Sequence, residues 1–97
     1  MAKVSLYIGS NNDTLRIDEE YKNKALNILD KYLEGYSQIP NVQGRWRKTN
    51  EESFLVVHYT NSVNRENLKV LCEDLKKNLN QIAIGVEIDE RINFEEF

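Results

Sequence analysis

The sequence predicts an α+β fold in which a four-stranded antiparallel sheet carries two helices on one face. Three observations lead to this prediction. Four segments of strand periodicity are separated by two segments of helical periodicity, in the order β-α-β-β-α-β. Each helical segment follows a residue that caps helices well. The two middle strands are joined by only a few polar residues, which is typical of a hairpin.

The first strand and the first helix are predicted within residues 3–34. Alternate residues of the segment 3–8 are aliphatic, which indicates a strand with one apolar face. Asp18 then caps a helix that runs to Glu34, with two acids in its first turn, where the helix dipole favours negative charge. Gly35 suits a left-handed stop after this helix.

The central hairpin is expected to join a strand over residues 42–48 to a strand over residues 53–60. Pro40 and Asn41 open the first of these strands. Residues 49–52 are then the polar tip of the hairpin, because they separate the two extended runs.

The second helix is predicted to begin after Asn64, which can cap it, and to end at Asn80. Leucines recur along it at helical spacing and give it one buried stripe. Residues 82–88 alternate between aliphatic and other residues, which predicts the last strand.

This order of elements closes most simply as a ferredoxin-like β-α-β-β-α-β sandwich with strand order 4-1-3-2 and both helices on one face. A chain of 97 residues fits one such domain, covering residues 1–97. Residues 89–97 are acidic and keep the apolar alternation at Ile92 and Phe94. They are expected to be a strand extension or an acidic tail, with a frayed terminus as the alternative.

The charge of the chain limits its partners. The formal net charge is −3, so the protein is not built to neutralise phosphates, and we expect no binding of nucleic acid. One cysteine allows no intrachain disulfide, which favours a reducing compartment. The apolar segment at the start is too short for a signal peptide or a membrane span. We therefore expect a cytoplasmic protein without a membrane partner.

Pairing across the predicted hairpin decides which side chains share a face. With the tip at residues 49–52, Trp46 lies opposite Leu55, and both are expected in the core beneath the helices. Arg45 and Arg47 then project from the opposite face. A nucleic-acid site built from an aromatic ring and cationic side chains needs both on one surface, so this pairing argues against such a site.

The face opposite the helices is the candidate interaction surface. It is expected to combine apolar side chains with a rim of charge, which marks protein contacts or ligand sites. The alternative is an ordinary surface on which arginine stems cover the apolar groups. We expect the chain to form a dimer or trimer through this face, the last strand or both. With two residues of the tail, the candidate residues are Tyr7, Arg45, Arg47, Phe54, Val56, His58, Glu87, Ile92 and Phe94.

No catalytic constellation is visible in the sequence, and we expect a protein that is not an enzyme. His58 is the only histidine, and no Cys-His spacing suggests a metal site. Cys72 falls on the buried stripe of the second helix, so a core role is expected for it. No catalytic, metal-binding or cofactor-binding residues are therefore assigned, and no cofactor is expected.

The chain contains the motifs LYIGSN at residues 6–11, GYSQIPNVQGRWR at residues 35–47 and LNQIAIGVEI at residues 79–88. They resemble the LYxG start, the GxW hairpin and the NQxxI last strand of a class of small bacterial and phage ferredoxin-like proteins. The element order is also similar to that of PII- and CutA-type proteins, which are trimeric and hold ligands or metals between subunits. The chain lacks the long PII-type loop between the second and third strands, which argues against nucleotide binding of the PII kind.

Three functions remain open. The first is a non-catalytic binding or regulatory protein that acts by protein–protein contact. Its phage-like resemblance suggests an inhibitor of a host defence system, carried by a phage or mobile element, with a heterologous protein partner. The second is an oligomeric small-ligand protein of PII/CutA-like type that binds a nucleotide-like ligand near Tyr7, Arg45, Arg47 and His58. The third is a small enzyme acting on nucleotides or nucleic acid.

Overall fold

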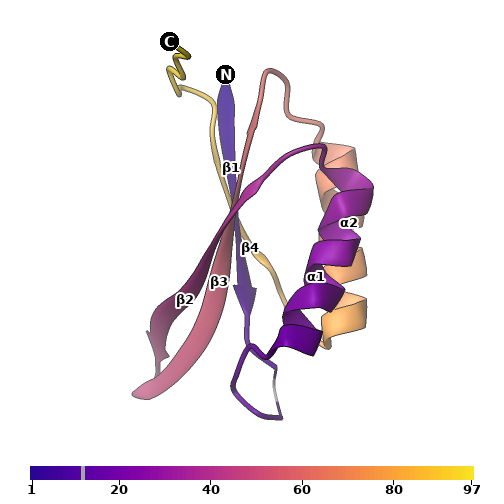
Figure 1. Ribbon diagram of the computed structural model, residues 1–97, viewed down its shortest axis with the longest axis vertical. Coiled ribbons are helices and arrows are strands. Elements are labelled where there is room, and N and C mark those ends of the chain that lie inside the picture. Colours follow the sequence, from indigo (N-terminus) through magenta and orange to yellow (C-terminus); the bar gives the residue numbers. More distant parts are fainter. Residues whose placement is uncertain (12) are drawn as a thin grey trace.

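The computed structural model describes residues 1–11 and 13–97, except for the side chain of Trp46. Its elements are β1 (Ala2–Gly9), α1 (Glu19–Tyr32), β2 (Ser37–Trp46), β3 (Thr49–Thr60), α2 (Arg65–Leu79) and β4 (Gly85–Asp89). The four strands form one antiparallel sheet in the order β2-β3-β1-β4. Both helices cover the same face of this sheet (Figure 1). The predicted ferredoxin-like fold is therefore confirmed, including its strand order.

The core lies between the helix-covered face of the sheet and the two helices. In β1, the even-numbered residues point toward the helices, as the alternation predicted, and they pair with even-numbered residues of β3. Both helices close the core with small and aliphatic side chains, as their periodicity indicated. The most deeply buried members of this core are Leu6, Ile8, Ala25, Leu29, Phe54, Val56, Leu71 and Leu75.

The helices begin where the sequence predicted. The Asp18 carboxylate accepts a hydrogen bond from the Tyr21 backbone N–H at 2.8 Å, and the Asn64 side chain accepts one from the Asn67 N–H at 3.0 Å. Asn80 ends α2 in the left-handed conformation, with a φ of 53°. Within the described residues, neither helix combines the length and apolarity needed to cross a lipid bilayer.

The predicted left-handed stop at Gly35 is wrong. The first helix ends at Tyr32, and Leu33 closes it in an extended conformation while its N–H donates to the Leu29 carbonyl. Among the described residues, no glycine has a positive φ. The chain therefore leaves α1 directly into an extended segment that leads to β2.

The predicted hairpin tip is also wrong, because the turn is centred three residues earlier. Trp46 pairs with Thr49, and Arg47 and Lys48 alone form the turn, with φ values of 48° and 66°. Two residues with positive φ are what a tight turn between twisted strands requires. The predicted burial of the Trp46 side chain falls outside the described part of the chain.

The two faces of β3 are the reverse of those expected. Phe54 pairs with Ile8 and Val56 pairs with Leu6, so both are buried beneath the helices rather than on the opposite face. Leu55 lies on the open face, which is the face of the sheet that the helices do not cover. The pairing with β1 fixes this choice, because the aliphatic side of β1 must face the helices.

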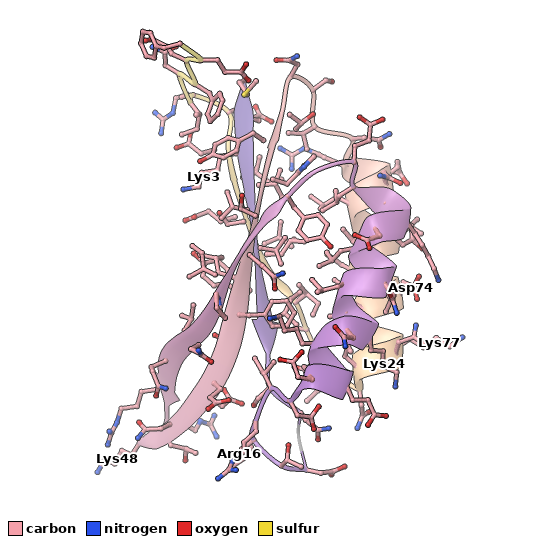
Figure 2. The ribbon with its side chains drawn as sticks, in the orientation of Figure 1. Lys3, Arg16, Lys24, Lys48, Asp74 and Lys77 are labelled. Atoms are coloured by element: carbon pink, nitrogen blue, oxygen red, sulfur yellow. The ribbon has the colours of Figure 1, made fainter. Side chains whose placement is uncertain are left out.

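Beyond β1, the hairpin continues as a two-stranded arm, formed by residues 43–52. The last pair shared with β1 involves Ser53, and four further pairs lead to the turn. This hairpin arm extends roughly 14 Å past the end of β1, at about 3.4 Å per residue. Figure 2 shows Lys48 at its far end, away from the helices.

The last strand is shorter than predicted. It begins at Gly85, and Ile82, which was expected within it, is 95% exposed. The strand ends at Asp89, and residues 90–97 form no strand. Ile84 and Ile88 still pack against the core, so the aliphatic alternation is correct in part of this segment.

Candidate ligand-binding site

The structure separates the residues of the expected interaction surface. Tyr7 and Glu87 lie on the open face, where they were expected. Phe54 and Val56 do not, since each is at most 1% exposed within the core. These two residues therefore cannot contact a partner in the folded protein.

Arg45, Arg47 and His58 are not neighbours either. Arg45 lies opposite Asn50 in the hairpin arm and donates to its side chain at 3.4 Å, and Arg47 is in the turn. His58 lies near the other end of β3 and pairs with Val4 on the helix-covered side of the sheet. Eight residues of extended strand separate position 50 from position 58, which is roughly 27 Å. The expected ligand site shared by Tyr7, Arg45, Arg47 and His58 is therefore wrong.

The C-terminal tail contacts the sheet through an aromatic pair. The rings of Phe94 and Tyr59 lie 4.9 Å apart between centroids and are tilted by 39°. Ile92 is partly buried. An exposed ion pair at 3.2 Å also joins Glu90 to Arg65 at the start of α2. The tail is thus held beside the end of β3 and the start of α2, and it does not continue the sheet.

The open face carries an apolar row across three strands. Tyr7 and Ile39 both lie opposite Leu55, on either side of it, and they are 43% and 47% exposed. Gly85 continues the row in β4, and a Cβ at this position would come within 3.3 Å of the Tyr7 Cβ. The close approach of Tyr7 to this backbone explains why a glycine stands there. The apolar row, Tyr7, Ile39 and Leu55, fits a contact with another protein surface.

A pocket of about 150 Å³ lies where the end of β3, the end of α1 and the start of α2 meet. We call it the His58 pocket. Its described lining contains no Lys, Arg, Asp or Glu side chain, so it is neutral, with one apolar and one polar wall. The lining residues are Val4, Tyr32, Leu33, His58, Thr60, Ser62, Val63, Asn64, Asn67 and Leu68.

Hydrogen bonds to backbone groups fix the polar wall of this pocket. The Thr60 hydroxyl donates to the Ser62 carbonyl at 2.9 Å and accepts from the Ser62 N–H at 3.3 Å. The Asn67 side-chain nitrogen donates to the Tyr32 carbonyl at 3.3 Å, which ties α2 to the end of α1. The Tyr32 hydroxyl donates to Asp74 at 2.9 Å, and this bond raises the pKa of Tyr32. The wall is therefore held in place before any ligand arrives.

His58 is oriented by a backbone carbonyl. Its Nδ1 lies 2.6 Å from the carbonyl oxygen of Gly35, in the segment that joins α1 to β2. His58 lines both the His58 pocket and a larger, open hollow. This placement makes His58 the one candidate residue from the sequence that lines the pocket.

The open hollow, which we call the adjoining hollow, has a volume of about 590 Å³ and shares Tyr32, His58 and Thr60 with the pocket. Its rim includes one acidic side chain, Glu34. Small-molecule sites usually enclose roughly 300–1,000 Å³ and bury most of the ligand. The pocket is half-open and smaller than this range, and the hollow is large enough but more open. The two together form part of a site that needs another surface to close it.

Sequence reasoning missed Tyr32, Thr60 and Asn67 as members of a site. One signal was available, because the segment 60–64 is wholly polar except for Val63 and leads from a strand into a capped helix. Such a connection places hydroxyl and amide groups beside a helix N-terminus. Among the described residues, no three His, Cys, Asp or Glu side chains gather as metal ligands, so the site has no metal centre to propose.

No protein-family model matches this chain, and no curated protein matches it. Solved structures do resemble it. CPII, a nitrogen regulatory PII-like protein from Thiomonas intermedia K12 bound to ADP, AMP and bicarbonate, aligns with a TM-score of 0.58 at 16% identity, over 91% of this chain and 86% of CPII.

Two further structures align similarly well. CutA1 from Oryza sativa has a TM-score of 0.59 at 15% identity, over 91% of this chain and 78% of its own. A phage SAM lyase in its apo state has a TM-score of 0.59 at 18% identity, over 93% of this chain and 80% of its own. At these identities the likeness concerns the fold. The chain therefore has the ferredoxin-like fold seen in PII-like and CutA proteins, as its element order predicted.

Proposed function

We propose that this protein binds a small adenosine-containing ligand in the His58 pocket, at a site that a second copy of the chain completes. The observation that carries the proposal is the neutral, half-polar pocket that opens into a shallow hollow. Two of the similar folds support the ligand class. CPII is bound to ADP and AMP, and the ligand of a SAM lyase also contains an adenosine.

The size of the pocket suits one ring of such a ligand. A cavity of about 150 Å³ accommodates a benzene-sized molecule. The six-membered ring of a purine therefore fits within the His58 pocket, between its aliphatic and its polar wall. The sugar then lies in the adjoining hollow, near Glu34. A carboxylate at this position favours a neutral or positively charged end of the ligand over a phosphate.

The open face supports the proposal that a second copy of the chain completes the site. An aromatic and two aliphatic side chains of the apolar row are partly in water, and burying what is still exposed contributes about half or less of the roughly 1.5–3 kcal/mol that a fully buried side chain gives. The adjoining hollow needs a further surface, and the second copy is the proposed source of it. The resemblance to PII- and CutA-type proteins points the same way, because those proteins hold ligands between subunits.

This proposal follows the second function that the sequence left open. The first function, an inhibitor carried by a phage or mobile element, gains no support from the similar folds. It stays a prediction, as does a heterologous protein partner. The similarity to a phage lyase concerns the fold and assigns no catalytic group here.

The experiment is isothermal titration calorimetry with adenosine, AMP, ADP and S-adenosylmethionine, which differ in the charge of the end that meets Glu34. We expect binding of at least one of them. Ser62→Trp adds a bulky side chain to the exposed lining of the pocket and should weaken that binding at least about tenfold. Thr14→Trp is the matched control, since Thr14 is exposed in the connection before α1. Absence of binding for all four ligands, or equal effects of both substitutions, would contradict the proposal.

A further inference from the structure

We infer that the His58 pocket selects a ring that carries an amino group, so that it accepts a 6-aminopurine and discriminates against a 6-oxopurine. The inference rests on the proposed function and adds the feature of the base that is recognised. Its basis is the direction of two hydrogen bonds that hold His58 and Asn67.

The bond to Gly35 fixes which nitrogen of His58 carries the proton. A backbone carbonyl oxygen only accepts hydrogen bonds, so Nδ1, at 2.6 Å from it, must be the donor. In a neutral imidazole the other nitrogen then has a free lone pair and no hydrogen. In the described part of the chain, this Nε2 has no hydrogen-bond partner. His58 therefore offers the pocket an acceptor.

The same reasoning applies to Asn67. The Tyr32 carbonyl can only accept, so the side-chain nitrogen of Asn67 must be the atom that bonds to it. Its side-chain oxygen is left as an acceptor. The pocket lining thus includes two acceptors, one from β3 and one from α2, and their orientation is set by backbone groups.

The other polar groups of the pocket leave the acceptors of His58 and Asn67 available to a ligand. The Thr60 hydroxyl already donates to and accepts from the backbone of Ser62. The Tyr32 hydroxyl is used by Asp74. The Asn64 oxygen caps α2, which leaves its amide nitrogen as a donor. The Ser62 hydroxyl and the remaining amide hydrogens of Asn64 and Asn67 are donors. Together with the two fixed acceptors, they can bind a ring edge on which an amino group with two hydrogens stands beside a ring nitrogen with a lone pair.

Adenine has this edge, because its 6-amino group has two hydrogens and lies beside ring nitrogens that accept. Hypoxanthine has a carbonyl oxygen in place of the amino group and a hydrogen on the neighbouring N1. Its single N–H on this edge can satisfy at most one of the two acceptors, while its oxygen would lie against the other and repel it. Sites built to hydrogen-bond a ligand N–H or O–H reject analogues that lack it much more strongly than sites that only exclude volume.

The test compares adenosine with inosine, which are both uncharged and differ only in the group at position 6 and the hydrogen on N1. We expect inosine to bind about tenfold to a hundredfold more weakly, measured by calorimetry at pH 8. If neither nucleoside nor any nucleotide binds, the proposed function is wrong. If both nucleosides bind equally, the proposed function stands and the present inference is overturned.

Substitutions then locate the selectivity. His58→Phe keeps a ring but removes the acceptor, so the ratio of the two affinities should fall toward one. Asn61→Ala is the control, because Asn61 lines the adjoining hollow and not the pocket. A ratio that stays unchanged in folded His58→Phe would assign recognition to other groups. If that variant does not fold, the comparison of the two nucleosides in the unaltered protein still decides the inference.

Discussion

Phe54 lies directly opposite Ile8 in the pairing of β3 with β1, and both side chains are almost completely buried beneath the helices. The next residue, Leu55, points to the open face, where it is partly in water. One step along β3 therefore separates the core of the subunit from the surface proposed for association.

Substitutions at these neighbouring positions should differ in their cost. Phe54→Ala is expected to lower the free energy of unfolding by about 3–5 kcal/mol, because it leaves a cavity in the core. Leu55→Ala should lower it by less than about 1.5 kcal/mol in the monomer, since its side chain is only partly buried. Urea denaturation at low protein concentration measures both values. Similar losses at the two positions would mean that the faces of β3 are misassigned.

The open face should mediate self-association. Ile39→Asp places a charge in the apolar row and is expected to shift the protein toward monomer in sedimentation velocity experiments. Val70→Asp is a matched control, because Val70 is similarly exposed but belongs to α2, on the helix side of the sheet. If the unaltered chain is a monomer at high micromolar concentration, or if both variants dissociate alike, association through this face is wrong.

The turn of the hairpin arm holds removable strain. Lys48 has a φ of 66°, which costs a residue with a Cβ about 1–2 kcal/mol relative to glycine. After the extra flexibility that glycine gives the unfolded chain, Lys48→Gly should raise the free energy of unfolding by up to about 1 kcal/mol. Lys48→Ala removes the same charge but keeps the Cβ, so it should bring no such gain. A loss of stability in the glycine variant would contradict the turn geometry.

Two tyrosines should make the fold sensitive to alkaline pH. Burial, with a smaller opposing effect of the Gln81 side chain, raises the pKa of Tyr21 to about 12, and burial together with the bond to Asp30 raises that of Tyr36 to about 12. Tyrosine is neutral when protonated, so both favour the folded state fully below pH about 10 and lose this effect as pH approaches about 12.

The absorbance of ionised phenol, followed during an alkaline titration, checks this expectation. Tyr21, Tyr32 and Tyr36 should ionise later in the folded protein than in denaturant, and Tyr21 and Tyr36 should do so only near pH 12. Tyr36→Phe should remove one late step and make stability less dependent on pH between about 10 and 12. Simultaneous ionisation of all five in the folded protein would contradict it.

The sequence predicted the starts of both helices and the end of the second, because these depend on local chemistry. Asp18, Asn64 and Asn80 are capping residues wherever a helix borders them, and their roles are confirmed. The hairpin was different, because Arg47 and Lys48 lack the Asn-Gly or Gly-Gly signal by which a tight turn is usually recognised.

The faces of β3 could not be predicted from that strand alone. Both of its sides are apolar, with Phe54 and Val56 on one and Leu55 and Val57 on the other. Only the pairing with β1 decides between them. The His58 pocket is similar in this respect, since its members come from four elements and the bond to Gly35 uses a backbone carbonyl, which no side-chain pattern reports.

The position of β1 at the centre of the sheet has a consequence for the order of folding. It pairs on one side with β3 and on the other with β4, which begins only at Gly85. The Gln81 side chain, which donates to the Ser10 carbonyl at 2.8 Å, also closes the end of β1 from far along the chain. Contacts between residues so distant in sequence slow folding. During synthesis, a nascent chain that has not yet released β4 therefore exposes an unpaired edge of its own central strand.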